Sequence, residues 1–106
     1  MEIEEFASIT RNIIAESGFD DFLPTACFPK RREVRALVGF PDDEDPEKPV
    51  LEWAEGLAVG HEEFLVAFKV DASHFKVIRK FRNDTVSKTF AVAQQTAPRD
   101  PTRRGA

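Results

Sequence analysis

The sequence predicts a single α+β domain in which one antiparallel sheet packs against two helices. The chain has 106 residues, a length that suits one domain. Two of its stretches carry apolar residues at helical spacing, and several short apolar runs are separated by turn residues. The segments follow one another in the order α-β-β-α-β-β-β. We expect a sheet of about four to five strands, with both helices on one of its faces, within residues 1–93.

The two helices are predicted from amphipathic spacing and from the residues at their ends. Apolar side chains recur along one face of residues 2–17, and Gly18 stands where a helix commonly ends in a residue of positive φ. A second helix is predicted over residues 46–59, because Pro46 suits the first helical position and apolar residues then recur at helical spacing.

The strands are predicted from apolar runs and from the turn residues between them. The runs at 22–28 and 34–40 flank a charged turn that contains proline, so they predict a hairpin. Between residues 62 and 92, bulky apolar residues recur at alternate positions, and short polar turns divide the stretch into three runs. This pattern predicts an antiparallel meander, although residues 62–69 also fit a helix.

Charge is distributed unevenly along the chain. The net charge is −4, but residues 1–68 carry an excess of acidic side chains and residues 69–106 an excess of basic ones. We expect an exposed acidic loop that contains Asp42, Asp43, Glu44 and Asp45. A solubilising role is the favoured interpretation of this loop, and contact with a partner is the alternative. Residues 94–106 contain two prolines and no bulky apolar side chain, so they are predicted to form a disordered basic C-terminal tail.

The single cysteine bears on the cellular compartment and on metal binding. Cys27 stands between alanine and phenylalanine, which predicts a buried reduced thiol and therefore a cytoplasmic protein. The acidic N-terminus and the lack of a long apolar run predict neither a secretory signal nor a membrane partner. Cys27, His61 and His74 are too few for a structural zinc site, so we expect no metal and no cofactor.

The most distinctive candidate surface follows Ser73. If Phe75, Phe81 and the other phenylalanines of residues 64–92 turn toward the core, the cations between them fall on the opposite face. A positively charged face of this kind would attract an acidic protein or phosphate. An ordinary solvated sheet face is the favoured interpretation, and the alternative is one basic binding surface made of His74, Lys76, Lys80, Arg82 and Lys88.

Catalytic patterns are missing from the sequence. The five glycines are isolated from one another, and neither histidine lies in a metalloprotease pattern. An imidazole beside carboxylates can act as an acid or base, and a thiol can act as a nucleophile. A small enzyme that uses His61, Glu62 and Cys27 is therefore one hypothesis, and an ordinary solvated turn at His61 is the favoured interpretation.

By elimination, the sequence favours a small non-enzymatic protein-interaction protein with an adaptor, chaperone-like or immunity-like role. It would present an edge strand, the acidic loop or the basic surface to a protein partner, as a monomer or weak homodimer. In size and charge the chain is similar to secretion chaperones and toxin-immunity proteins, a similarity that no motif carries. The alternative is a nucleic-acid or nucleotide binder that uses the basic face of the 74–88 hairpin. It is disfavoured because no aromatic residue is expected among the lysines and the pI is 5.2.

Overall fold

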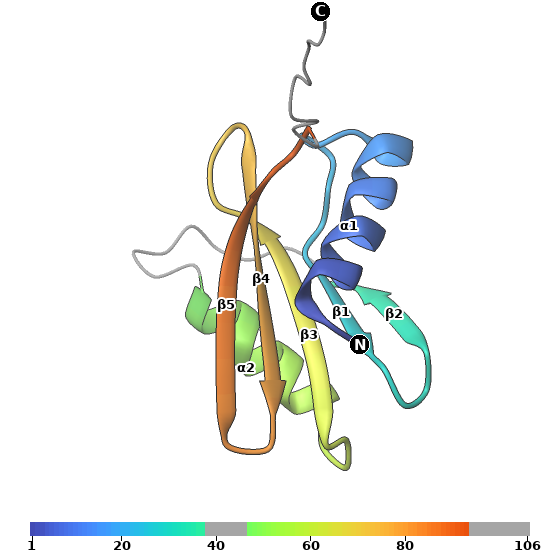
Figure 1. The fold of residues 1–106 in the computed structure, drawn as a ribbon, viewed down its shortest axis with the longest axis vertical. Coiled ribbons are helices and arrows are strands. Elements are labelled where there is room, and N and C mark those ends of the chain that lie inside the picture. The colour runs from blue at the N-terminus through green and yellow to red at the C-terminus, as the bar shows by residue number, and fades with distance from the viewer. Residues whose placement is uncertain (38–46, 94–106) are drawn as a thin grey trace, which may run out of the picture.

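The computed structural model describes residues 1–37 and 47–93, which form two helices and one five-stranded sheet (Figure 1). The predicted α+β class and the order of the elements are confirmed. The elements are α1 (Ile3–Ser17), β1 (Thr25–Phe28), β2 (Glu33–Ala36), α2 (Glu47–Leu57), β3 (Glu63–Lys69), β4 (His74–Phe81) and β5 (Asp84–Ala91).

The sheet is antiparallel throughout and has the strand order β2-β1-β3-β4-β5. β1 and β2 form the predicted hairpin, and β3, β4 and β5 form the predicted meander. The segment that also fitted a helix is the strand β3, which pairs with β1 and β4. The two edges of the sheet are therefore β2 and β5.

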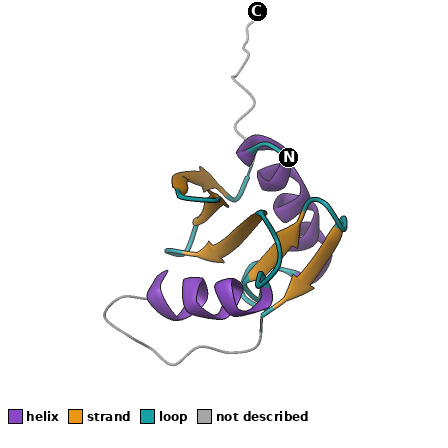
Figure 2. Cartoon of the chain, turned by 90° about the horizontal axis from the view of Figure 1, so that it is seen from below, coloured by secondary structure: helices purple, strands orange, loops and turns teal. Residues whose placement is uncertain are grey.

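The prediction that both helices pack on one face is wrong, because each helix covers its own face of the sheet. α1 packs in one core cluster with Leu65 and Ala67, and α2 packs in the other with Phe64, Val66 and Phe68. In Figures 1 and 2, the sheet lies between the two helices. The physical reason lies in β3, where consecutive apolar residues point their side chains to both faces of the sheet. Each face therefore needs a helix to bury these side chains.

The first helix begins and ends as its sequence predicts. Glu2 caps its start, where the Glu2 N–H donates to the Glu5 carboxylate at 3.0 Å. Gly18 follows its last residue with a φ of +86°, and the Gly18 N–H donates to the Ile14 carbonyl at 2.7 Å. The positive φ explains why glycine follows the helix.

Two predicted features lie outside the described residues, namely the acidic loop at residues 42–45 and the C-terminal tail at residues 94–106. Both remain predictions. Neither of the two helices within the described ranges is long and apolar enough to cross a membrane.

Candidate functional site

The cations predicted to form one basic surface lie on two faces of the sheet. Lys76 is directly opposite Phe68 in the β3–β4 ladder, and Lys80 is opposite Phe64. Residues opposite each other in a ladder share a face, so both lysines lie on the face covered by α2. Lys88 is opposite a residue of the α1 core cluster and lies on the other face.

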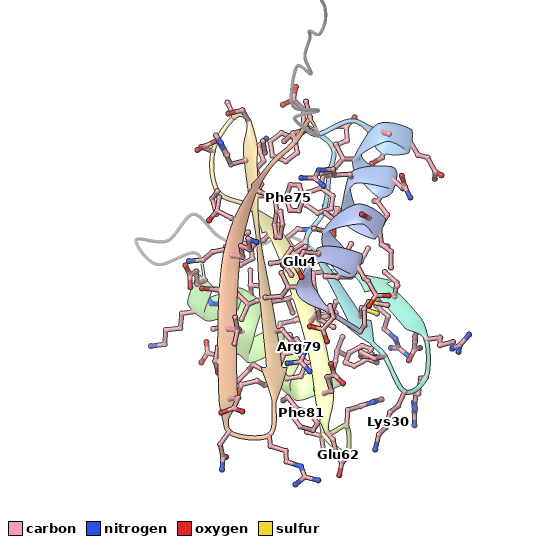
Figure 3. All side chains as sticks on the ribbon, viewed as in Figure 1. Glu4, Lys30, Glu62, Phe75, Arg79 and Phe81 are labelled. Atoms are coloured by element: carbon pink, nitrogen blue, oxygen red, sulfur yellow. The ribbon has the colours of Figure 1, made fainter. Side chains whose placement is uncertain are left out.

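The prediction that the phenylalanines of residues 64–92 share one face is wrong. They occupy even positions in β3 and odd positions in β4, and the register pairs even positions with even ones. Phe64 and Phe68 therefore lie beside the lysines under α2. Phe75 and Phe90 lie under α1, where their rings stack with centroids 5.7 Å apart. Figure 3 shows Phe75, Arg79 and Phe81 projecting from β4 on the side of α1.

Each of the five predicted binding residues contacts a carboxylate within the fold. Two glutamates of α2 bind the β4 lysines, with Lys76 contacting Glu47 and Lys80 donating to Glu55 at 2.5 Å. Each of these predicted binding residues therefore lies within contact distance of a carboxylate of the chain itself, and exposed ion pairs of this kind are individually weak. The remaining pairs are Arg82 with Glu62 at 3.5 Å, Lys88 with Glu4 at 3.3 Å and His74 with Asp71 at 3.0 Å.

A pocket of 390 Å³ at the end of α2 brings together residues from two separate hypotheses. His61 and Glu62 belong to the enzyme hypothesis, and Lys80 and Arg82 to the basic surface. The imidazole of His61 packs against the Phe28 ring with centroids 4.7 Å apart. The pocket therefore holds cations and carboxylates in pairs, and an imidazole that contacts an apolar ring.

Glu62 joins two turns of the sheet in this pocket. Lys30, from the β1–β2 turn, donates to its carboxylate at 2.6 Å, and Arg82 approaches from the β4–β5 turn. Lys30 and Glu62 are labelled at the same end of the sheet in Figure 3. The pKa of Glu62 is lowered, first by the hydrogen bond from Lys30 and then by the charges of Lys30 and Arg82. Glu62 is therefore committed to ion pairs rather than poised as a base near neutral pH.

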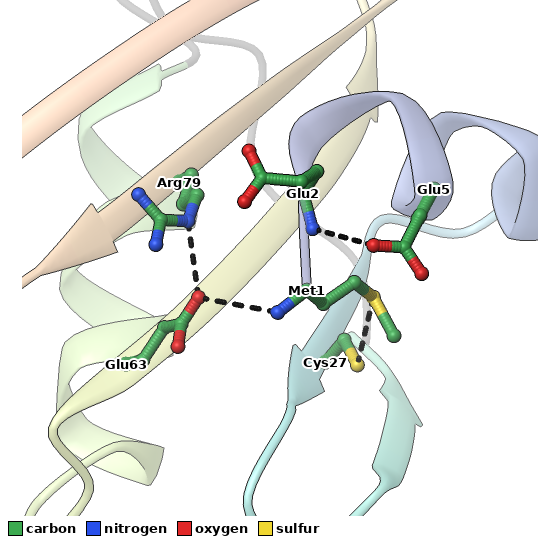
Figure 4. Close-up of polar contacts among 6 residues, drawn as sticks. All are labelled: Met1, Glu2, Glu5, Cys27, Glu63 and Arg79. Carbon is green, nitrogen blue, oxygen red and sulfur yellow. Dashed lines mark hydrogen bonds and ion pairs between the residues drawn. The ribbon is translucent and has the colours of Figure 1, made fainter.

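The structure does not bring Cys27 to His61. Cys27 belongs to the α1 core cluster, whereas His61 packs on Phe28, a residue of the α2 cluster. Burial raises the pKa of the Cys27 thiol, and its Sγ lies 4.0 Å from the Met1 sulfur (Figure 4). A neutral thiol on the opposite face of the sheet from the imidazole cannot use that imidazole as its base.

Metal ligands do not converge in residues 1–37 and 47–93, where no group of three or more His, Cys, Asp or Glu side chains is placed to hold an ion. Near the N-terminus, acidic and basic groups pair with one another instead. Glu63 contacts Arg79 at 3.0 Å and the Met1 amino group at 3.7 Å (Figure 4).

The β5 edge is the most exposed part of the sheet. Among residues 1–37 and 47–93, β5 pairs only with β4, and side chains 84–89 are all exposed. None of these six residues belongs to either core cluster. The β4–β5 register runs through all eight residue pairs without a bulge, so β5 is a regular strand whose other side is open in the part of the chain that the structure describes.

The direction of the backbone groups on β5 follows from one hydrogen bond. The Val92 N–H donates to the Ser73 carbonyl at 2.8 Å, which makes that pair a hydrogen-bonded one. Hydrogen-bonded pairs alternate along an antiparallel ladder, so even-numbered residues of β5 direct their N–H and C=O groups to β4. Thr85, Ser87 and Thr89 therefore direct these groups outward, along the free edge.

Sequence reasoning named an edge strand as one option but did not identify β5, because strand order depends on the long-range pairing of β1 with β3. The exposed hydroxyl residues of β5, Thr85, Ser87 and Thr89, belong to no sequence motif that would identify them as an edge. Their alternation with Val86 and Lys88 fits any half-exposed strand. Comparison with protein-family models, with curated proteins and with solved structures finds no match.

Proposed function

We propose that this chain is a cytoplasmic, non-enzymatic protein-interaction protein whose β5 edge accepts an extended strand from a protein partner. The observation that carries the proposal is the open side of β5, where Thr85, Ser87 and Thr89 direct N–H and C=O groups outward. A partner strand would satisfy these groups and extend the sheet by one strand.

The lack of edge protection on β5 supports this proposal. Edge strands are commonly blunted by proline, by bulges, by charged side chains or by being short. β5 has eight residues, contains no proline, and keeps a regular register, with Lys88 as its only cation. Strand addition to this edge would need no rearrangement of the core, because residues 84–89 lie outside both clusters.

The two alternative functions receive less support from the geometry. A nucleic-acid binder would need cations free to contact phosphate, whereas the predicted cations are paired with carboxylates and divided between two faces. An enzyme that uses Cys27 and His61 would need them in one pocket, whereas they lie in opposite layers.

Site-specific photo-crosslinking tests the proposal directly. A photoreactive phenylalanine analogue replaces Thr89 on the β5 edge, or Val34 on the β2 edge as a matched control. Both side chains are exposed on edge strands. In an extract of the native cells, we expect a specific adduct at position 89 and none at position 34, with the captured protein identified by mass spectrometry.

A second substitution shows whether capture depends on backbone pairing. Ser87→Pro removes one outward N–H without removing a bond to β4, and Ser87→Ala keeps that N–H. Capture at position 89 is expected to fail in the proline variant and persist in the alanine variant, both with an unchanged circular dichroism spectrum. Equal capture in the two variants, or no capture at position 89, would refute strand addition at β5.

A further inference from the structure

We infer that the strand bound by β5 is the β5 strand of a second copy of this chain, paired antiparallel around a two-fold axis at Val86. This inference rests on the proposed function, because it names the partner for the same edge. Its basis is that β5 complements itself in one register, in charge, in side-chain size and in backbone direction.

Symmetry restricts the registers that β5 can adopt with itself. An antiparallel pair of identical strands has its two-fold axis perpendicular to the sheet, passing between two copies of the same residue. With Val86 on the axis, Asp84 faces Lys88 of the second copy, and Lys88 faces its Asp84. The register thus forms two opposite-charge pairs that flank a contact between two valines.

The backbone of β5 suits this register. Val86 directs its N–H and C=O groups to β4, so the pair on the axis is a non-hydrogen-bonded one, in which side chains approach most closely. Thr85 and Ser87 direct their groups outward and lie opposite each other's copies. They form reciprocal hydrogen-bonded pairs on both sides of the axis.

Neighbouring registers lack this complementarity. An axis at Lys88 places two lysines directly opposite each other, which is destabilising. An axis at Ser87 places Val86 opposite Lys88 and leaves Asp84 opposite Phe90. The Val86 register is therefore the one that pairs both charges of the exposed residues of β5.

The surroundings of Val86 and Asp84 also favour a second copy. Val86 is 52% exposed and lines a groove of 240 Å³ beside the start of α1, so a second Val86 would cover apolar surface. Asp84 takes part in none of the ion pairs formed by the described residues, and Lys88 would bridge it to Glu4. At the other end of β5, the Arg11 guanidinium donates to the Ala91 carbonyl at 3.2 Å and occupies the edge there. The open segment thus coincides with residues 84–89.

Charge-swap variants test the register. Asp84→Lys makes a strand with lysine at both flanking positions, and Lys88→Asp makes one with aspartate at both. Each single variant is expected to weaken self-association at least about tenfold in sedimentation analysis, because like charges then face each other. An equimolar mixture of the two variants is expected to associate, because every facing pair is then opposite in charge. The double variant Asp84→Lys/Lys88→Asp is expected to recover the dimer.

Disulfide trapping tests the axis independently. Val86→Cys places two thiols opposite each other at the axis and is expected to form a covalent dimer under mild oxidation. Ser87→Cys is expected to remain monomeric, because its copies are offset. Cys27 is 1% exposed and does not compete. Preferential trapping of Ser87→Cys would overturn the Val86 register.

The failure of this inference is distinguishable from the failure of the proposed function. A wild-type chain that stays monomeric up to millimolar concentration, without trapping of Val86→Cys, would overturn the homodimer. Capture of a different protein at position 89, with the same sensitivity to Ser87→Pro, would then keep the interaction function. If the chain neither self-associates nor captures another protein at position 89, both the homodimer and the interaction function are overturned.

Discussion

The two edges of the sheet differ in length, in local pairing and in how they are attached to the core. β2 has four residues, and within it Arg35 donates to Glu33 at 2.8 and 2.6 Å. The next residue after β2, Leu37, is fully buried, and its N–H donates to the Pro24 carbonyl. β5 has eight residues, and its first six are exposed and belong to neither core cluster.

This difference indicates which edge is available to a partner. A short strand that carries paired charges offers few backbone groups and is a common form of protected edge. A long regular strand offers a row of them, which in β5 is closed only near Ala91, where Arg11 occupies the carbonyl. The sheet is therefore protected at β2 and open at β5.

The largest expected effect comes from truncating the core attachment of the β2 edge. Leu37→Ala removes a side chain that is 0% exposed and packs in the α2 cluster, so it should lower the free energy of unfolding by about 2–5 kcal/mol. At concentrations where the chain is monomeric, Val86→Ala on β5 is the matched control and should change the free energy of unfolding by less than about 0.5 kcal/mol. Urea denaturation measures the free energy of unfolding of both variants. Similar losses in the two variants would show that β5 is attached to the core as firmly as the β2 edge.

The second prediction concerns amide hydrogen exchange along β5 in dilute solution, where the chain is monomeric. The amides of Thr85, Ser87 and Thr89 should exchange at least about tenfold faster than those of Val86 and Lys88, because only the latter donate to β4. Exchange followed by NMR resolves the individual residues. Uniform protection along β5 in the monomer would show that its outer side is not open.

Most of the local structure was predictable from the sequence because it depends on short-range patterns. Helical spacing predicted α1 and α2, and period-two alternation with short turns predicted the hairpin and the meander. The placement of α2 was not predictable in this way. The pairing of β1 with β3 makes β3 a central strand, and the consecutive apolar residues of β3 then need a helix on each face of the sheet.

The candidate site was predictable only in part. Alternation correctly placed Lys76 and Lys80 on one face of β4, but the glutamates that bind them come from α2, through contacts remote in sequence. Lys88 was placed on the wrong face, because hairpin register decides which positions of β5 align with β4. Local patterns therefore identified charged residues without revealing that the fold pairs their charges.

The third prediction concerns two buried threonines. Thr25, in the strand beside β2, has a buried hydroxyl with no hydrogen-bond partner among the described residues, whereas the Thr10 hydroxyl donates to the Phe6 carbonyl at 2.8 Å. Thr25→Val should therefore raise the free energy of unfolding by about 1 kcal/mol, and Thr10→Val should lower it by a similar amount. Thermal denaturation of both variants checks the sign, and a destabilised Thr25→Val would show that its hydroxyl is satisfied.

The smallest effect is electrostatic and compares the turns that lead to the two edges. Lys30, before β2, and Arg82, before β5, both contact Glu62, whose pKa they lower. A carboxylate with a lowered pKa in the folded state contributes stability above its usual pKa, and this contribution is lost as the pH falls through the lowered value. The Lys30 hydrogen bond is the leading cause, so Lys30→Met should raise the pKa of Glu62 more than Arg82→Met does.

Arg31→Met removes a charge from the same turn as Lys30 and serves as the control. Carboxyl NMR titration measures the pKa of Glu62 in all three variants. A larger increase in Arg82→Met would mean that the turn before β5, the open edge, stabilises the Glu62 carboxylate more than the turn before β2, the protected edge.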